Sequence, residues 1–149
     1  MTGLSRRQVL AASAGALAVA GFGVAPAQAA NNAQDLIKAF TGGKPAPEAK
    51  VKLDLPEIAE NGNTVPMTVT VESPMTEASH VTEVLVLADG NPNAGVATFN
   101  FSPASGVAEA NTRIRLATTQ NIIAIAKMND GSFVMASKQV KVTIGGCGG

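Results

Sequence analysis

The stretch IIAIAKMNDGSFVMASKQVKVTI, residues 122–144, predicts two β-strands joined by a tight turn. Asn129, Asp130 and Gly131 form a strong hairpin signal because these residue types tolerate a positive φ. Residues 122–126 are apolar at every position, so the first strand needs a cover on both of its faces. Either it is a central strand with a short helix on its outer face, or that face meets another protein.

A short helix is predicted before this β region. Asn32 is a suitable N-cap, and Leu36, Ile37 and Phe40 recur at helical spacing before Gly42 and Gly43 end the helix. Residues 44–48 are predicted as a linker. A helix of this length is marginal alone, so its apolar face must dock on the domain or on a partner chain, and both options remain open.

Further β-type segments recur between turn residues, with no helical period among them. Residues 113–116 alternate cleanly, as an edge or half-exposed strand should. Together with the hairpin, the segments predict about seven strands and an all-β fold, an immunoglobulin-like antiparallel β-sandwich with a short N-terminal helix. The chain lacks the Cys-Trp-Cys core of antibody-type domains. The additional predicted strands are 51–55, 64–72, 81–88, 95–101 and 112–118.

The first residues have the three parts of an export signal. Arg6 and Arg7 precede an apolar run over 9–24 that is diluted by glycine, and Ala27-Gln28-Ala29 offers small residues for a signal peptidase. This pattern predicts a twin-arginine signal peptide over 1–29, one β-sandwich domain over 30–149, and a periplasmic location. No stable membrane association is expected after cleavage; the alternative is an uncleaved anchor.

Composition limits the partners of the mature chain. Removal of Arg6 and Arg7 leaves nine basic and eleven acidic residues, a net charge of −2. The basic residues are scattered, and Trp and Tyr are absent. This composition argues against nucleic-acid binding, which relies on basic stripes and stacking aromatics. Aromatics make up 3% of the chain, so the core depends on aliphatic residues, which is compatible with a stabilising partner or with none.

The chain ends in the sequence GGCGG, residues 145–149, and Cys147 is its only cysteine. The surrounding glycines Gly145, Gly146, Gly148 and Gly149 offer no side chain to bury the sulfur. We therefore expect an exposed thiol on a thin, mobile arm rooted in the strand that ends at Ile144. The alternative is a frayed end without a role. However, an idle unpaired cysteine is a liability in an oxidising compartment.

Other candidates for chemistry are weak. His80, the only histidine, is expected at a turn or on the surface, and Asp54, Glu57 and Glu60 are expected to be solvated. A cysteine hydrolase needs a base beside its nucleophile, and the sequence offers none near Cys147. Phosphate loops, metal-ligand clusters and dinucleotide motifs are missing from the sequence. No cofactor and no metal are therefore predicted, and the body of the chain shows no active site.

The ending 140–149 and the internal stretches 58–66 and 113–121 resemble the SoxY family, the sulfur-carrier subunits of the periplasmic Sox thiosulfate-oxidation system. The resemblance implies that Cys147 covalently holds thiosulfate-derived sulfur while other enzymes act on it, so that the chain is a carrier and not an enzyme. It also implies a heterodimer with SoxZ, a second small β protein that could cover the doubly apolar strand. The implied transient partners are the c-type cytochrome SoxAX, the hydrolase SoxB and, in many systems, the sulfur dehydrogenase SoxCD.

Two other function classes remain open. A terminal Gly-Gly also occurs in ubiquitin-like sulfur carriers activated as thiocarboxylates, but these need cytosolic ATP, and the export signal argues against them. The second alternative is an exported β-sandwich binding module with an incidental C-terminal thiol. This module would function unchanged with Cys147 blocked.

Overall fold

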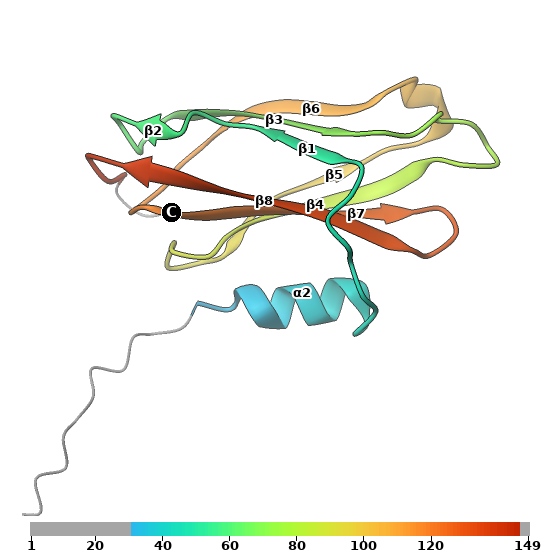
Figure 1. Ribbon diagram of the computed structural model, residues 1–149, viewed down its shortest axis with the longest axis horizontal. Coiled ribbons are helices and arrows are strands. Elements are labelled where there is room, and N and C mark those ends of the chain that lie inside the picture. Colours follow the sequence, from blue (N-terminus) through green and yellow to red (C-terminus); the bar gives the residue numbers. More distant parts are fainter. Residues whose placement is uncertain (1–30, 147–149) are drawn as a thin grey trace, which may run out of the picture.

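The computed structural model describes residues 31–146, which form two β-sheets packed face to face with one helix outside them (Figure 1). These residues contain eight strands, a 3-10 turn and the helix α2 (Ala33–Thr41). The predicted β-sandwich with a short N-terminal helix is confirmed, with one strand more than expected. The predicted signal segment 1–29 with Arg6 and Arg7, and Cys147, Gly148 and Gly149, lie outside the described residues.

The smaller sheet has three antiparallel strands in the order β1–β3–β6. They are β1 (Val51–Asp54), β3 (Val65–Val71) and β6 (Ala108–Ile114). Successive side chains of a strand point to opposite faces, so every second residue of β3, from Val65 to Val71, is buried against the other sheet. Strand β6 pairs only with β3 and is an edge strand; of the alternating residues 113–116, the first two lie in it.

The larger sheet has five strands in the order β2–β8–β7–β4–β5. Strand β2 runs parallel to β8, and the other pairs are antiparallel. The prediction of a purely antiparallel fold therefore misses β2, whose two residues are too few to form a period. The strands are β2 (Ile58–Ala59), β8 (Phe133–Val142), β7 (Gln120–Met128), β4 (Val81–Ala88) and β5 (Gly95–Asn100).

The predicted hairpin turn joins β7 and β8. Gly131 has a φ of 84°, a conformation that glycine adopts without strain. The Asp130 carboxylate accepts hydrogen bonds from the Ser132 hydroxyl (2.6 Å) and backbone N–H (2.8 Å). These hydrogen bonds, the one from the hydroxyl foremost, hold the pKa of Asp130 below its ordinary value because they stabilise the ionised form.

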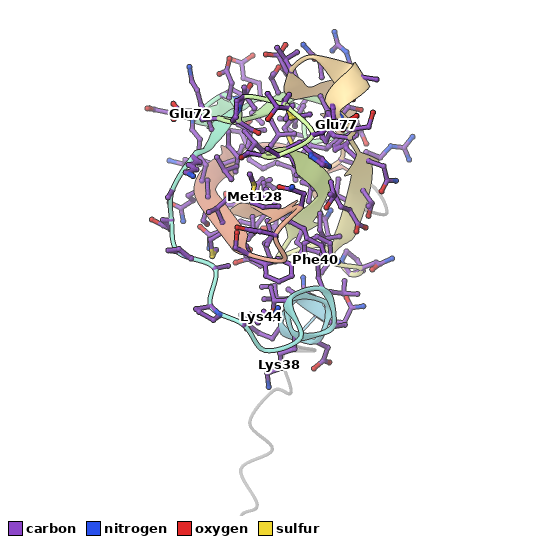
Figure 2. The ribbon with its side chains drawn as sticks, turned by 90° about the vertical axis from the view of Figure 1, so that its right-hand side faces the viewer. Lys38, Phe40, Lys44, Glu72, Glu77 and Met128 are labelled. Atoms are coloured by element: carbon purple, nitrogen blue, oxygen red, sulfur yellow. The ribbon has the colours of Figure 1, made fainter. Side chains whose placement is uncertain are left out.

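Strand β7 is the central strand of the larger sheet, and α2 covers its outer face. The side chains of Leu87, Ile123, Ile125 and Phe133 meet Leu36, Ile37 and Phe40 of the helix there. The Phe40 and Phe133 rings meet edge to face with centroids 5.6 Å apart. Figure 2 shows Phe40 on the side of α2 that faces the sheet and Lys38 on the opposite side. Of the two predicted covers for this strand, the structure uses the helix.

Two local predictions need correction. The strand predicted over 112–118 lies at Ala108–Ile114, because its partner β3 begins at Val65, opposite Ile114, and offers no ladder beyond that residue. Asn32 occupies the N-cap position of α2 without a side-chain cap; its Oδ1 accepts a hydrogen bond from the Ala94 N–H (3.1 Å) instead.

The helix ends as predicted, with Gly42 in the left-handed conformation. Within residues 31–146, no helix has the length and apolar character needed to cross a membrane.

Candidate functional site

Strand β8 brings the C-terminal segment to the end of the sandwich where β2 lies, opposite the loop between β3 and β4 (Figure 1). Beyond the strand, the Thr143 N–H donates to the Ala59 carbonyl oxygen (3.1 Å) and its hydroxyl donates to that of Glu60 (3.0 Å). The chain that leads to Cys147 is therefore bound to the last residue of β2 and to the residue that follows it.

Three backbone segments meet at this end in a closed ring of hydrogen bonds. The Gly62 N–H donates to the Ile144 carbonyl oxygen, the Gly146 N–H to that of Leu116, and the Leu116 N–H to that of Gly62, each at 2.8 Å. Each segment thus donates to one neighbour and accepts from the other. Gly146, the residue before Cys147, is buried in this ring.

The position of Gly145 and Gly146 differs from the sequence-based expectation of an arm that is free from Gly145 onward. Gly146 is hydrogen-bonded, and Gly145 lies against the Ala117 carbonyl group. The physical reason is that glycine permits close backbone packing as well as mobility. The fixed root of the chain end therefore lies at Gly146, two residues beyond Ile144.

The segment 115–117, which contributes Leu116 to the ring, is also held by a network of the buried side-chain amides of Asn91 and Gln120. Asn91 Nδ2 donates to the Arg115 carbonyl oxygen (2.8 Å), and Asn91 Oδ1 accepts from the Ala117 N–H (2.9 Å). Gln120 Nε2 donates to the same oxygen (2.8 Å), and its Oε1 accepts from the Gly90 N–H (2.8 Å). Asn91 and Gln120 are both buried away from water, so these hydrogen bonds supply the partners that their polar atoms need.

Sequence reasoning missed Gly62 and Asn91 as parts of this site. Asn61-Gly62 and Asn91-Pro92 are visible in the sequence only as turn signals. Nothing in the local pattern pairs either turn with the chain end, because the contacts form only when both sheets are assembled. The link between Gly62 and Gly146 spans most of the sandwich domain in sequence.

The other predicted residues lie where the sequence places them. His80 precedes β4, and its Nδ1 lies 2.9 Å from the Thr76 carbonyl oxygen in a turn, at the β7–β8 hairpin end of the sandwich. The ten residues of β8 separate that end from Gly146, roughly 30 Å of extended chain. His80 is therefore remote from the residue that precedes Cys147. Asp54, Glu57 and Glu60 are exposed, as expected.

Metal ligation finds no support in the described part of the chain. Residues 31–146 contain no group of three or more His, Cys, Asp or Glu side chains that could hold an ion. The site consists of hydrogen-bonded backbone segments that hold the chain up to Gly146, one residue before the cysteine.

In a comparison with protein families, residues 37–147 match the model described as sulfur oxidation protein SoxY. Among solved structures, the sulfur carrier protein SoxY of Chlorobium limicola f thiosulfatophilum is similar, with 33% identity and a TM-score of 0.63. The match covers 74% of this chain and 96% of that one. No curated protein sequence matches at a significant level.

More distant structures share the fold. A superoxide reductase (neelaredoxin) from Ignicoccus hospitalis has 19% identity and a TM-score of 0.56, covering 63% of this chain and 80% of its own. A putative superoxide reductase from Thermotoga maritima has 22% identity and a TM-score of 0.52, covering 69% and 89%. At these identities the likeness concerns the sandwich architecture alone.

Proposed function

The chain belongs to the SoxY family of sulfur oxidation proteins, and on that basis we propose that it is a sulfur carrier whose attachment point is Cys147. The observation that carries this proposal is the extent of the family match, which runs from residue 37 to the only cysteine of the chain. A thiolate is a nucleophile that forms and exchanges sulfur–sulfur bonds, which suits a covalent sulfur carrier.

The proposed loading step is an oxidation. The Cys147 thiolate and thiosulfate form one sulfur–sulfur bond and release two electrons, which pass to a c-type cytochrome partner such as SoxAX. Water then attacks the terminal sulfonate in a hydrolase such as SoxB, so that sulfate leaves with two protons and a persulfide anion stays on Cys147. A sulfur dehydrogenase such as SoxCD would oxidise the remaining sulfane. The carrier itself supplies the thiol and presents it to these enzymes.

The surroundings of the chain end support a carrier role. The hydrogen bonds around Gly146 join backbone groups alone: its N–H donates to the Leu116 carbonyl oxygen, and the Gly62 N–H donates to that of Ile144. The only histidine is roughly a strand length away. A cysteine hydrolase needs a base beside its nucleophile, so the distance of this histidine from Gly146 favours partner enzymes as the source of each chemical step.

Two further parts of the proposal concern location and assembly. The Arg6-Arg7 pair, the apolar run over 9–24 and the Ala27–Ala29 site support export to the periplasm by the twin-arginine route. A heterodimer with SoxZ is proposed from family membership. Since α2 already covers the apolar outer face of β7, SoxZ would bind elsewhere on the sandwich.

Replacement of Cys147 by Ser tests the attachment point. A hydroxyl cannot hold sulfane sulfur, and the change adds no bulk. With the Sox enzymes reconstituted, Cys147→Ser should lower thiosulfate-dependent cytochrome reduction to the rate without carrier. Intact mass of the wild-type chain should show a thiosulfonate adduct that the variant lacks.

The fold of the variant serves as its control. Its thermal unfolding and its binding to SoxZ should match those of the wild type. Turnover retained by Cys147→Ser would show that sulfur is held elsewhere, and would favour the binding module with an incidental thiol.

A further inference from the structure

Three glycines lie where a side chain has no room, at the end of the sandwich where β2 and the C-terminal segment meet. A Cβ added to Gly62 would overlap the Leu116 carbonyl oxygen and lie 2.8 Å from the Gly146 nitrogen. A Cβ on Gly145 would overlap the Ala117 carbonyl oxygen, and one on Gly146 would lie 2.8 Å from that of Gly62. None of the three is among the glycines with a positive φ, so close packing, and not an unusual backbone conformation, requires glycine there.

The segment against which these glycines pack is itself fixed. The Asn91 side-chain amide bonds both Arg115 and Ala117, the residues on either side of Leu116. Leu116 is fully buried in the core between the sheets. Gly62, Leu116 and Ala117 therefore form a rigid support, here named the arm seat, on which Gly145 and Gly146 rest.

We propose that the arm seat is a positioning element that sets the point and direction in which Cys147 leaves the sandwich. Its consequence for sulfur transfer rests on the carrier role proposed for Cys147. Only one peptide unit, about 3.8 Å between Cα atoms, separates Cys147 from the seated Gly146. Partner enzymes would therefore meet the thiol at a defined place on the surface, and would order fewer free residues on binding.

The hold is reversible. Gly146 is bound to the seat by a single backbone hydrogen bond, to Leu116, and Gly145 by packing against Ala117. An enzyme that draws the arm deeper can release both glycines without unfolding either sheet. The arm seat thus holds the base of the arm before an enzyme binds. After binding, Gly145 and Gly146 can leave the seat and lengthen the arm.

Hydrogen–deuterium exchange of the SoxZ-bound chain tests the seat without any sulfur chemistry. In the wild type the Gly146 N–H should be protected, although it lies three residues from the chain end. Gly62→Ala should speed its exchange about tenfold or more by displacing the Leu116 segment. Gly95→Ala is the matched control, because its Cβ would meet Asn93 and Leu36 at an ordinary 3.7 Å.

Kinetics of the same variants test positioning. Gly62→Ala should raise the apparent KM of the loading cytochrome for the carrier about tenfold while leaving kcat within about twofold, because the thiol is intact but misplaced. Alkylation of Cys147 by a small reagent should change less than about twofold, since it needs no defined direction. Gly145→Ala, placed beyond β8 and outside both sheets, repeats the test with less risk to folding.

The two proposals fail in different ways. Fast hydrogen exchange at the Gly146 N–H of the wild type would overturn the arm seat even if Cys147 carries sulfur. An unchanged KM in both Gly62→Ala and Gly145→Ala would do the same. A protected Gly146 in a chain that never acquires a sulfur adduct would leave the seat standing and refute the carrier role.

Discussion

At the scale of single residues, Asn91 has a large structural role that its sequence context does not reveal. Its buried side chain bonds Arg115, Ala117 and Gln120. Asn91→Leu keeps the volume but leaves the Arg115 carbonyl and the Ala117 N–H without this partner, while Gln120 Nε2 keeps only its bond to the Thr118 carbonyl oxygen. Each such group costs about 1–3 kcal/mol, and we expect the free energy of unfolding to fall by about 3 kcal/mol or more. Urea denaturation measures the loss.

The neighbouring Asn93 supplies the control. It is exposed, and its side chain accepts only the Gly95 N–H two residues away. Asn93→Ala should therefore change the free energy of unfolding by about 1 kcal/mol or less. Equal effects of the two substitutions would mean that the buried network does not hold the 115–117 segment.

Glycine shows why the candidate site could be predicted only in part at this scale. The sequence alone identifies Cys147 as the residue to examine, since it is the only thiol and sits in a distinctive terminal motif. Yet glycine in a sequence is compatible with a mobile arm and with close backbone packing. Gly146 packs against Gly62 because a turn distant in sequence lies beside it, and no local pattern encodes that contact.

At the scale of elements, the docking of α2 on the larger sheet is the feature most open to test. Phe40 meets Phe133 edge to face, and both belong to the apolar cluster under the helix. Phe40→Ala should lower the free energy of unfolding by about 2 kcal/mol, less than for a fully buried ring, because Phe40 is only partly buried. Chemical denaturation gives the value.

Exposure of the sheet provides a second readout for the same change. Undocking of α2 would uncover Ile123 and Ile125, so an apolar dye should bind Phe40→Ala more strongly than the wild type. Lys38→Ala, on the outward side of the helix, should leave stability and dye binding unchanged. No effect of Phe40→Ala on either readout would contradict the docking.

Element prediction succeeded where one physical signal dominated. The sequence predicts a strand over 64–72 and a hairpin at the Asn-Asp-Gly turn, and the structure has both. The apolar run of β7 predicts a strand covered on both faces and leaves two covers open, of which the structure uses the helix. The first half of β6, Ala108–Asn111, carries residues with little strand preference and is a strand because β3 pairs with it. Strand order and the parallel β2–β8 pair depend on such long-range pairing, so the sequence could not predict them.

At the scale of the whole molecule, a carrier of thiosulfate-derived sulfur must reach the compartment where thiosulfate is oxidised. The transporter of the twin-arginine route reads the arginine pair and carries folded proteins, so the sandwich could cross already bound to a partner without a signal of its own. Replacing both Arg6 and Arg7 by Lys keeps the charge of the segment but removes the pair. We expect this variant, and SoxZ with it, to stay in the cytoplasm.

Immunoblots of periplasmic and cytoplasmic fractions measure the outcome. The matched control replaces Arg113 and Arg115, two exposed arginines of the mature chain, by Lys, and it should be exported like the wild type. Both variants lose the same number of guanidinium groups, so a difference between them reports on the position of the pair. Normal periplasmic levels of the Arg6 and Arg7 variant would refute twin-arginine export, and normal levels of SoxZ alone would show that SoxZ does not depend on this chain for its transport.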